Sequence, residues 1–167
     1  ITLELMVNSI IVFLRNPELG KVKTRLAAEV GNEKALIVYK DMLAYTLDVV
    51  REAAAHTHLY FSEHINDTIG NNIISSRKTV QNGNDLGEKM NNAFCDVLNQ
   101  FGGKVIIIGT DCPGINSRIL QEAFDHLSNK DIVIGPAADG GYYLLGMKAA
   151  HPMLFQLVEW SSSSVLQ

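Results

Sequence analysis

The sequence predicts an α/β fold in which helices flank both faces of a mainly parallel sheet. Short, almost continuous apolar runs rich in β-branched residues lie at 9–14 and 104–109, and such runs are typical of parallel strands covered on both faces. Segments of this kind alternate with longer ones whose apolar residues recur every three or four positions, as on one face of a helix. The length of 167 residues suits one compact domain. In such a fold, ligands bind beyond the carboxyl ends of the strands.

The first half of the chain is expected to hold two strands and one long helix. Pro17 and Gly20 favour a turn after the first strand, because both are unfavourable inside a helix. Leu36, Tyr39 and Leu43 are spaced as on one helical face. In chain order, we expect a strand over 9–14, a loop over 15–25, a helix over 32–55, a strand over 57–62 and an irregular connection over 63–78, with or without a short helix.

The second half is expected to alternate helices and strands and to end in a hairpin. The pair Asn82-Gly83 marks a turn, and a second, Gly-rich turn separates the last two apolar runs. In chain order, we expect a helix over 86–101, a strand over 104–109, a helix over 117–128, a strand over 131–135, a turn over 136–141 and a strand over 142–146.

Composition excludes several classes of protein. The chain has 14 Lys and Arg against 18 Asp and Glu, a net charge of -4, so no overall basic field attracts nucleic acid or an anionic membrane. Cys95 and Cys112 are too few and too differently placed for a disulfide framework or a four-ligand zinc site, and they indicate a reducing compartment. No apolar run approaches the roughly 20 residues that cross a bilayer. We therefore expect a cytoplasmic protein that binds no nucleic acid and does not insert into membranes.

A basic loop follows the first predicted strand. Its four cations, Arg15, Lys21, Lys23 and Arg25, fall within eleven residues of an otherwise acidic chain. Lysine offers a mobile point charge and arginine a two-pronged donor, and with backbone N–H groups at the start of the next helix they suit a pyrophosphate. The alternative is a basic loop that is simply solvated.

Acidic residues follow two later strands and precede one helix. Asp111 lies just after the strand over 104–109, where a carboxylate suits Mg2+ or Mn2+, although capping of the next turn or helix is the alternative. Asp139 stands beside Gly140 and Gly141, which permit close backbone approach to a ligand or else form a tight hairpin. Asp85 precedes a predicted helix and is a candidate helix cap. The basic loop, Asp111 and the turn that carries Asp139 are expected to converge at one edge of the sheet.

Four stretches, 13–26, 83–90, 109–113 and 135–146, together resemble the bacterial family DUF2064, whose members are called glycosyltransferase A-like or arsenosugar-type glycosyltransferases. The resemblance implies a single-domain nucleotide-diphospho-sugar transferase fold, of the GT-A, Rossmann-like type, over residues 9–167. Relatives look longer, so the domain is expected to lack a C-terminal helix and strand. Residues 1–8 are expected to be an N-terminal extension or residues added before the natural start.

The resemblance also implies roles for residues at motif positions. Lys23 and Arg25 look like phosphate binders, Asp111 like the acid of the glycosyltransferase metal motif and Asp139 like a second acid near metal or acceptor. The motif reads Thr-Asp-Cys here rather than Asp-X-Asp, so one usual carboxylate is replaced. The predicted nucleotide- and phosphate-binding residues are Arg15, Lys21, Lys23, Arg25, Asp85, Gly140 and Gly141; the predicted catalytic residues are Lys23 and Asp139; and the predicted ligands of Mg2+ or Mn2+ are Asp111 and Asp139.

Three functions remain open on these residues. The first is a metal-dependent glycosyltransferase that uses a nucleotide-diphospho-sugar donor and a small-molecule acceptor. The second is a nucleotidyltransferase that joins a nucleoside triphosphate to a phosphorylated small acceptor, as guanylyltransferases of the same superfamily do. The third is a nucleotide-binding domain without catalysis.

Overall fold

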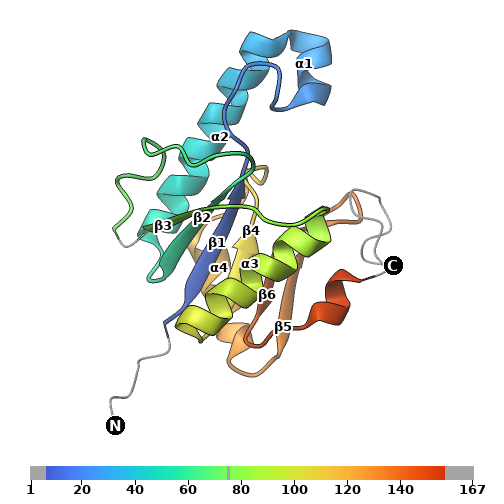
Figure 1. Ribbon diagram of the computed structural model, residues 1–167. Coiled ribbons are helices and arrows are strands. Elements are labelled where there is room, and N and C mark those ends of the chain that lie inside the picture. The colour runs from blue at the N-terminus through green and yellow to red at the C-terminus, as the bar shows by residue number, and fades with distance from the viewer. Residues whose placement is uncertain (1–6, 75, 157–167) are drawn as a thin grey trace.

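Six strands form one sheet in the order β3-β2-β1-β4-β6-β5 in the computed structural model of the chain, which describes residues 7–74 and 76–156 (Figure 1). The strands are β1 (Ser9–Leu14), β2 (His56–Phe61), β3 (Ser76–Val80), β4 (Val105–Ile108), β5 (Ile132–Pro136) and β6 (Tyr142–Met147). β1 pairs in parallel with β2 and β4, and β2 pairs in parallel with β3. β6 runs antiparallel to both of its neighbours, β4 and β5. The mainly parallel sheet is thus confirmed.

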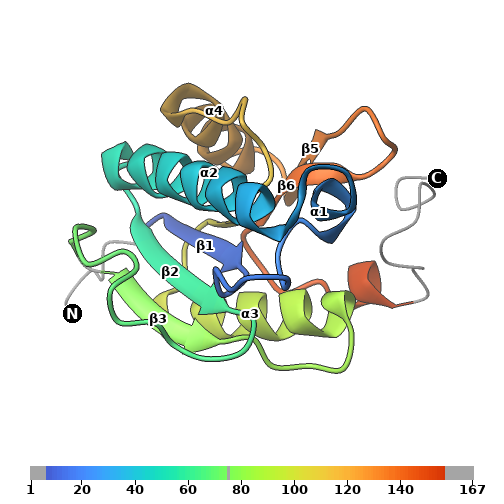
Figure 2. The same cartoon turned by 90° about the horizontal axis from the view of Figure 1, so that it is seen from above.

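Helices cover both faces of this sheet, as Figure 2 shows from above. The helices are α1 (Thr24–Val30), α2 (Asn32–Glu52), α3 (Leu86–Phe101), α4 (Ser117–Leu127) and the 3-10 turn η1 (Pro152–Phe155). α2 and α4 lie on one face and α3 on the other, while α1 and the start of α2 project beyond the carboxyl edge of the strands (Figures 1 and 2).

The core follows from the alternation of side chains along β1. Ile10 and Val12 belong to one buried cluster together with Leu43 of α2 and Phe124 of α4. Ile11 points to the opposite face and belongs to a second cluster with helix α3. Because β1 is central and apolar on both faces, it is buried along nearly its whole length, as the continuous apolar run predicts.

Two elements differ from the sequence expectation. β3, with the sequence SRKTV, lies in the segment expected to be irregular, because an edge strand rich in charge lacks an apolar run. α1 begins at Thr24, so the loop expected over 15–25 ends at Lys23, and Arg25 is helical. This seven-residue helix has no buried residue and therefore no apolar face to reveal it.

The remaining elements agree with expectation to within a few residues, α2 ending at Glu52 rather than at 55. No helix in the two described ranges is both long and apolar enough to cross a membrane. The expectations for residues 1–6 and for residues 157–167 lie outside the described residues.

The strand order creates a switch point between β1 and β4. From β1 the chain continues to β2 and β3 on one side, whereas β4 is placed on the other side. The loops that leave β1 and β4 therefore diverge and open a crevice at the carboxyl ends of these two strands, which is where open α/β sheets bind ligands.

Candidate functional site

A cavity of about 520 Å³ lies at this switch point. Its walls come from segments far apart in the sequence that meet at the carboxyl edge of the sheet. They include Arg15 and Asn16 after β1, Ser62 and Glu63 after β2, Gln81 after β3, residues 109–111 after β4, and Leu86 and Lys89 of α3. We call this space the switch-point cavity.

Asn16 fixes the loop that leaves β1. Its side chain is only 3% exposed. The carboxamide donates to the His64 carbonyl oxygen at 2.8 Å and accepts from the Glu63 amide nitrogen at 3.1 Å. These bonds tie the loop after β1 to the loop after β2, so one wall of the switch-point cavity is preformed.

Tyr39 of α2 joins the ends of β1 and β4. Its hydroxyl donates to the Arg15 carbonyl oxygen and accepts from the Arg15 amide nitrogen, both at 2.8 Å. Thr110, after β4, donates to the same hydroxyl at 3.5 Å. Burial raises the pKa of Tyr39, an effect that the hydrogen bonds from Thr110 and Arg15 partly oppose. Tyr39 is therefore an uncharged residue that holds the ends of β1 and β4 together at the cavity.

Lys23 and Asp111 meet across the switch point. The Lys23 Nζ lies 2.9 Å from the Asp111 Oδ1, and the two side chains are 22% and 73% exposed. Lys23 precedes α1 in the left-handed conformation, with φ 48 and ψ 44, which costs a non-glycine residue about 1 kcal/mol. A predicted phosphate-binding lysine and the predicted metal-binding acid are thus brought together by the fold.

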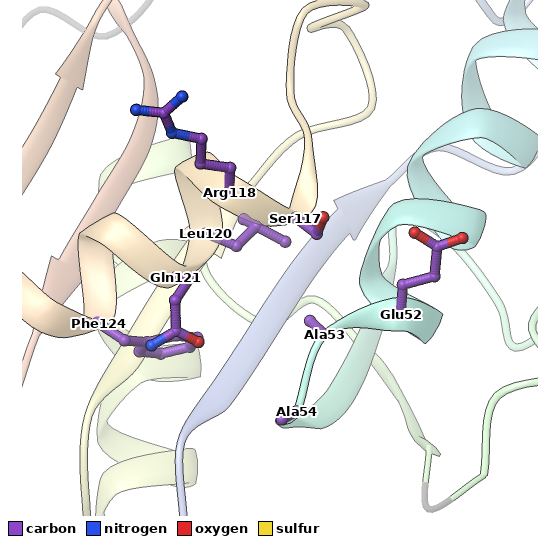
Figure 3. A pocket seen from close by; sticks show the side chains of 8 residues that line it. All are labelled: Glu52, Ala53, Ala54, Ser117, Arg118, Leu120, Gln121 and Phe124. Atoms are coloured by element: carbon purple, nitrogen blue, oxygen red, sulfur yellow. The ribbon is translucent and has the colours of Figure 1, made fainter.

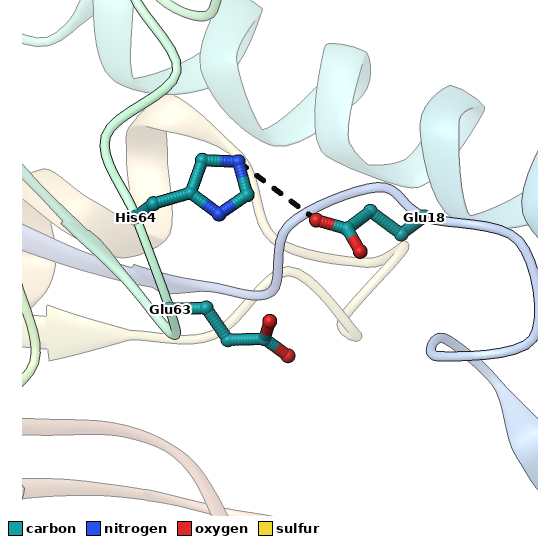
Figure 4. Close-up of side chains that lie close together, drawn as sticks. All are labelled: Glu18, Glu63 and His64. Atoms are coloured by element: carbon teal, nitrogen blue, oxygen red, sulfur yellow. Dashed lines mark ion pairs between the residues drawn. The ribbon is translucent and has the colours of Figure 1, made fainter.

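Lys21 is held by two acids at the rim of the cavity. Its Nζ lies 2.7 Å from Glu18 Oε2 and 2.9 Å from Glu63 Oε2. These hydrogen bonds raise the pKa of Lys21 to about 12. Figure 4 shows that Glu18, Glu63 and His64 gather here, and their candidate ligand atoms lie within 4.8 Å of one another. Because the Lys21 ammonium bonds to both carboxylates, this cluster is already balanced by a cation.

The other predicted cations are less engaged. Arg15 lines the switch-point cavity, and its guanidinium donates to the Lys21 carbonyl oxygen at 3.5 Å. Arg25 is exposed on α1. Among the residues that the structure describes, neither arginine forms an ion pair with a carboxylate. Both guanidinium groups are therefore available to bind an anion.

The turn between β5 and β6 carries the second predicted acid. Because β5 runs parallel to β1, this turn lies at the same edge of the sheet as Asp111. The Asp139 Oδ1 accepts from the Gly141 amide nitrogen at 3.1 Å, and Gly140 adopts a φ of 86 that favours glycine. β5 and β6 form a hairpin through residues 137–141, in line with the structural alternative for this turn, whereas Asp139, Gly140 and Gly141 lie outside the set of residues that line the switch-point cavity. Their roles at metal, acceptor and nucleotide stay predictions.

Asp85 has a structural partner. Its Oδ1 accepts from the Glu88 amide nitrogen at 2.8 Å, and Glu88 in turn accepts from the Asn84 amide nitrogen at 2.7 Å. The Asp85 side chain thus caps the start of α3, and Glu88 holds the residue before the cap. The helix cap expected from propensity is therefore confirmed, and nucleotide binding by Asp85 stays a prediction.

Asp111 suits a divalent cation by its donor chemistry. Its carboxylate is largely exposed at the cavity wall and already binds a cation, the Lys23 ammonium. Mg2+ and Mn2+ take hard oxygen ligands, and Mg2+ commonly binds one or two carboxylates with phosphate oxygens and water. The described residues place no group of three acidic or thiol and imidazole ligands around Asp111. A metal here would therefore need phosphate oxygens to complete its coordination.

Sequence reasoning missed three residues of the site. From the sequence, Asn16 is a loop residue and Tyr39 a core residue. Only the fold shows that their hydrogen bonds hold the walls of the cavity. Lys89 of α3 is a half-buried cavity residue whose side chain forms no ion pair or hydrogen bond within 7–74 and 76–156. The sequence does carry one signal of Lys89. A lysine in the first turn of a helix is unfavourable because the helix dipole is positive there, so its presence just after Asp85 suggests a role other than helix stability.

A second cavity, of about 340 Å³, lies between the end of α2 and α4 (Figure 3). Glu52 and Arg118 are its charged residues, and Leu120 and Phe124 belong to the core beneath it. Arg118 also pairs with Glu122 at 2.8 Å. This groove gathers none of the predicted site residues.

Comparisons with known proteins agree with this arrangement. The family model DUF2064, described as an uncharacterized protein conserved in bacteria, matches residues 46–162. A protein of known structure from Desulfovibrio desulfuricans G20, provisionally named a nucleotide-diphospho-sugar transferase, is 31% identical with a TM-score of 0.87, covering 95% of this chain and 71% of that one. No curated protein matches.

More distant structures share the fold. A 4-diphosphocytidyl-2C-methyl-D-erythritol synthase from Anaerococcus prevotii DSM 20548 is 13% identical with a TM-score of 0.61, covering 96% of this chain and 80% of that one. A cytidylyltransferase from Leptospira borgpetersenii is 15% identical with a TM-score of 0.54, covering 90% and 62%. The predicted nucleotide-diphospho-sugar transferase fold is confirmed.

Proposed function

We propose that this chain, which belongs to the DUF2064 family, is a metal-dependent transferase that takes a nucleotide-diphospho-sugar as its donor. The observation that carries the proposal is the 2.9 Å contact of Lys23 with Asp111, which lines the switch-point cavity although Lys23 itself does not. An ammonium group and a carboxylate side by side at the switch point of the sheet suit a diphosphate and its metal ion. The name of the related protein from Desulfovibrio desulfuricans supports the same class of reaction.

The residues of the chain would share the work of binding the diphosphate. Lys23 and Arg15 would bind phosphate oxygens, and the Tyr39 hydroxyl keeps the Arg15 backbone in place. Asp111 would hold Mg2+ or Mn2+, which supplies charge stabilisation to the departing diphosphate when bound. Asp139, in the turn at the same sheet edge, would orient or deprotonate the acceptor hydroxyl.

Nucleotidyl transfer is the second candidate, and the shared fold of the cytidylyltransferase and synthase structures favours it. In that reaction Lys23 would steady the triphosphate, and pyrophosphate would leave when the nucleotide joins a phosphorylated acceptor. Release of pyrophosphate from GTP or CTP separates this reaction from sugar transfer, in which a nucleoside diphosphate leaves instead.

Calorimetry of UDP- and GDP-sugars with and without Mn2+ tests the proposal, with Asp111→Asn as the site variant. We expect Asp111→Asn to lower the Mn2+-dependent affinity by at least about tenfold, because the exposed carboxylate is the predicted protein ligand. Asp131→Asn is the matched control, since Asp131 is 76% exposed and also pairs with a lysine, Lys148, at 3.2 Å.

The outcomes separate the candidates. Equal metal-dependent affinity in Asp111→Asn and Asp131→Asn would contradict the metal assignment. Metal-dependent nucleotide binding without transfer to any acceptor in a broad panel would favour a nucleotide-binding domain without catalysis.

A further inference from the structure

The proposed metal ligand is already occupied by a cation from the chain itself. The Lys23 ammonium bonds to Asp111 Oδ1 at 2.9 Å. We infer that Lys23 is a specificity-determining residue of the proposed site: it keeps free divalent cations off Asp111, so that the site takes up its metal together with a diphosphate. This inference rests on the proposed function and names the order in which its ligands bind.

Geometry makes the two cations compete. Mg2+ lies about 2.0 to 2.1 Å from a carboxylate oxygen, so it cannot share Oδ1 with an ammonium that already approaches that atom. Binding to the other carboxylate oxygen would place two cations side by side on one acid. Among the described residues, no group of three acidic, thiol or imidazole ligands includes Asp111 to offset that repulsion.

Charge balance reverses the outcome when a diphosphate is present. Lys23 and Asp111 neutralise each other, so a free divalent ion would bring an uncompensated double positive charge to the site. A diphosphate supplies the missing negative charge and gives Lys23 new oxygen acceptors. Lys23 can then leave Asp111 without losing a partner, and Asp111 becomes available to the metal that arrives with the phosphates.

The placement of Lys23 allows this exchange. It directly precedes α1, a helix with no buried residues, and its own side chain keeps 22% of its surface exposed. A small movement of the Lys23 side chain therefore displaces no buried residue of α1, while Val22 before it stays in the core. The second lysine of the loop, Lys21, is bound by Glu18 and Glu63, so it does not replace Lys23 on Asp111.

Manganese titrations followed by electron paramagnetic resonance test the inference at low ionic strength, where exposed charges are least screened. We expect Lys23→Gln to bind free Mn2+ at least about tenfold more tightly than the unaltered protein, since the competing ammonium is gone. The gain should vanish in the double variant Lys23→Gln, Asp111→Asn. Glutamine keeps a Cβ in the left-handed position, so the backbone preference changes little.

The control is Lys130→Gln, which removes the same charge from an exposed lysine between α4 and β5, at the opposite edge of the sheet. With GDP or UDP added, the order should invert, and the Mn2+-nucleotide complex should bind Lys23→Gln more weakly than the unaltered protein. Circular dichroism establishes that each variant is folded.

The two levels of the proposal fail in different ways. If Mn2+-nucleotide binding depends on Asp111 but Lys23→Gln leaves the affinity for free Mn2+ unchanged, the inference about Lys23 is overturned and the proposed function stands. If neither protein binds nucleotide with Mn2+, the proposed function is overturned, and with it the role given to the diphosphate.

Discussion

The hydroxyl of Tyr39 lies 2.8 Å from both the amide nitrogen and the carbonyl oxygen of Arg15. One side chain on α2 thereby satisfies both backbone groups of the first residue after β1. These groups have left the ladder of the sheet and have no strand partner, so the hydroxyl replaces a backbone partner at the point where the cavity begins.

Tyr39→Phe should therefore lower the free energy of unfolding by about 1 to 2 kcal/mol, because it leaves a buried donor and acceptor unpaired. Urea denaturation measures the change. Tyr143→Phe is the matched control, since no hydrogen bond of the Tyr143 hydroxyl is found within the described part of the chain. A loss no larger than that of the control would show that water replaces the hydroxyl at no cost.

Asp85 offers a choice between a structural and a ligand-binding role. Its carboxylate caps α3 through the Glu88 amide at 2.8 Å. Asp85→Ala should cost about 1 kcal/mol of stability, and Asp85→Asn, which keeps an acceptor, should cost much less. Thermal unfolding of both variants measures this difference.

The same two variants test nucleotide binding by Asp85. If the cap is its whole role, both should bind Mn2+-nucleotide with unchanged affinity. Equal loss of affinity in Asp85→Ala and Asp85→Asn, despite their different stabilities, would restore the carboxylate to the binding site.

Lys89 is the cavity lysine without a carboxylate partner in the described ranges, whereas Lys21 is paired at the same cavity. An unpaired ammonium in a polar cavity attracts anions at little cost in lost contacts. Lys89→Ala should weaken nucleotide binding about threefold, as expected for one partly screened charge. Calorimetry with GDP and UDP measures it, with Lys130→Ala as the control; identical affinities in the two variants would remove Lys89 from the site.

The sequence predicts most of the sheet because its central strands are apolar on both faces. β1 was expected over 9–14 and occupies those residues, and α3 was expected over 86–101 and does so too. β3 and α1 escape prediction for opposite reasons: the first is a charged edge strand and the second is too short and exposed to show a face. Neither element buries a regular set of apolar residues, and such a set is what a periodic sequence pattern reveals.

The site is predictable in its charges but not in its contacts. The convergence of Lys23 and Asp111 follows from strand order and was expected, since both follow parallel strands. Which of four cations meets Asp111 depends on the path of one loop, and the sequence carries no sign of it. Tyr39 was expected on the core face of its helix, yet its hydrogen bonds to a residue 24 positions away arise only from packing.

His58 is a buried titratable group on the side of the sheet that α3 covers. It is 2% exposed, its Nε2 lies 3.3 Å from Ser9 Oγ, and its Nδ1 has no partner in the described part of the chain. Burial lowers the pKa of His58 to about 4, with smaller contributions from the charges of Arg77 and His56, while Asp96 acts in the opposite direction. The folded protein therefore holds this imidazole neutral.

The consequence for stability depends on the unfolded chain, in which histidine titrates near pH 6.5. Between about pH 6.5 and 4, His58 is protonated in the unfolded chain but not in the folded protein, so stability falls as the pH falls through that window. Above about pH 6.5 the imidazole is neutral in both states, and His58 has no effect on the pH dependence of stability. From about pH 7.5 to 4.5, urea denaturation should show the unaltered protein losing about 2 to 3 kcal/mol more than His58→Gln or His58→Leu, because groups that titrate elsewhere are common to all three. His126→Gln, at an exposed position, should lose as much as the unaltered protein. Parallel losses in the unaltered protein and both His58 variants would mean that the imidazole is protonated within the fold, and the low pKa would then be wrong.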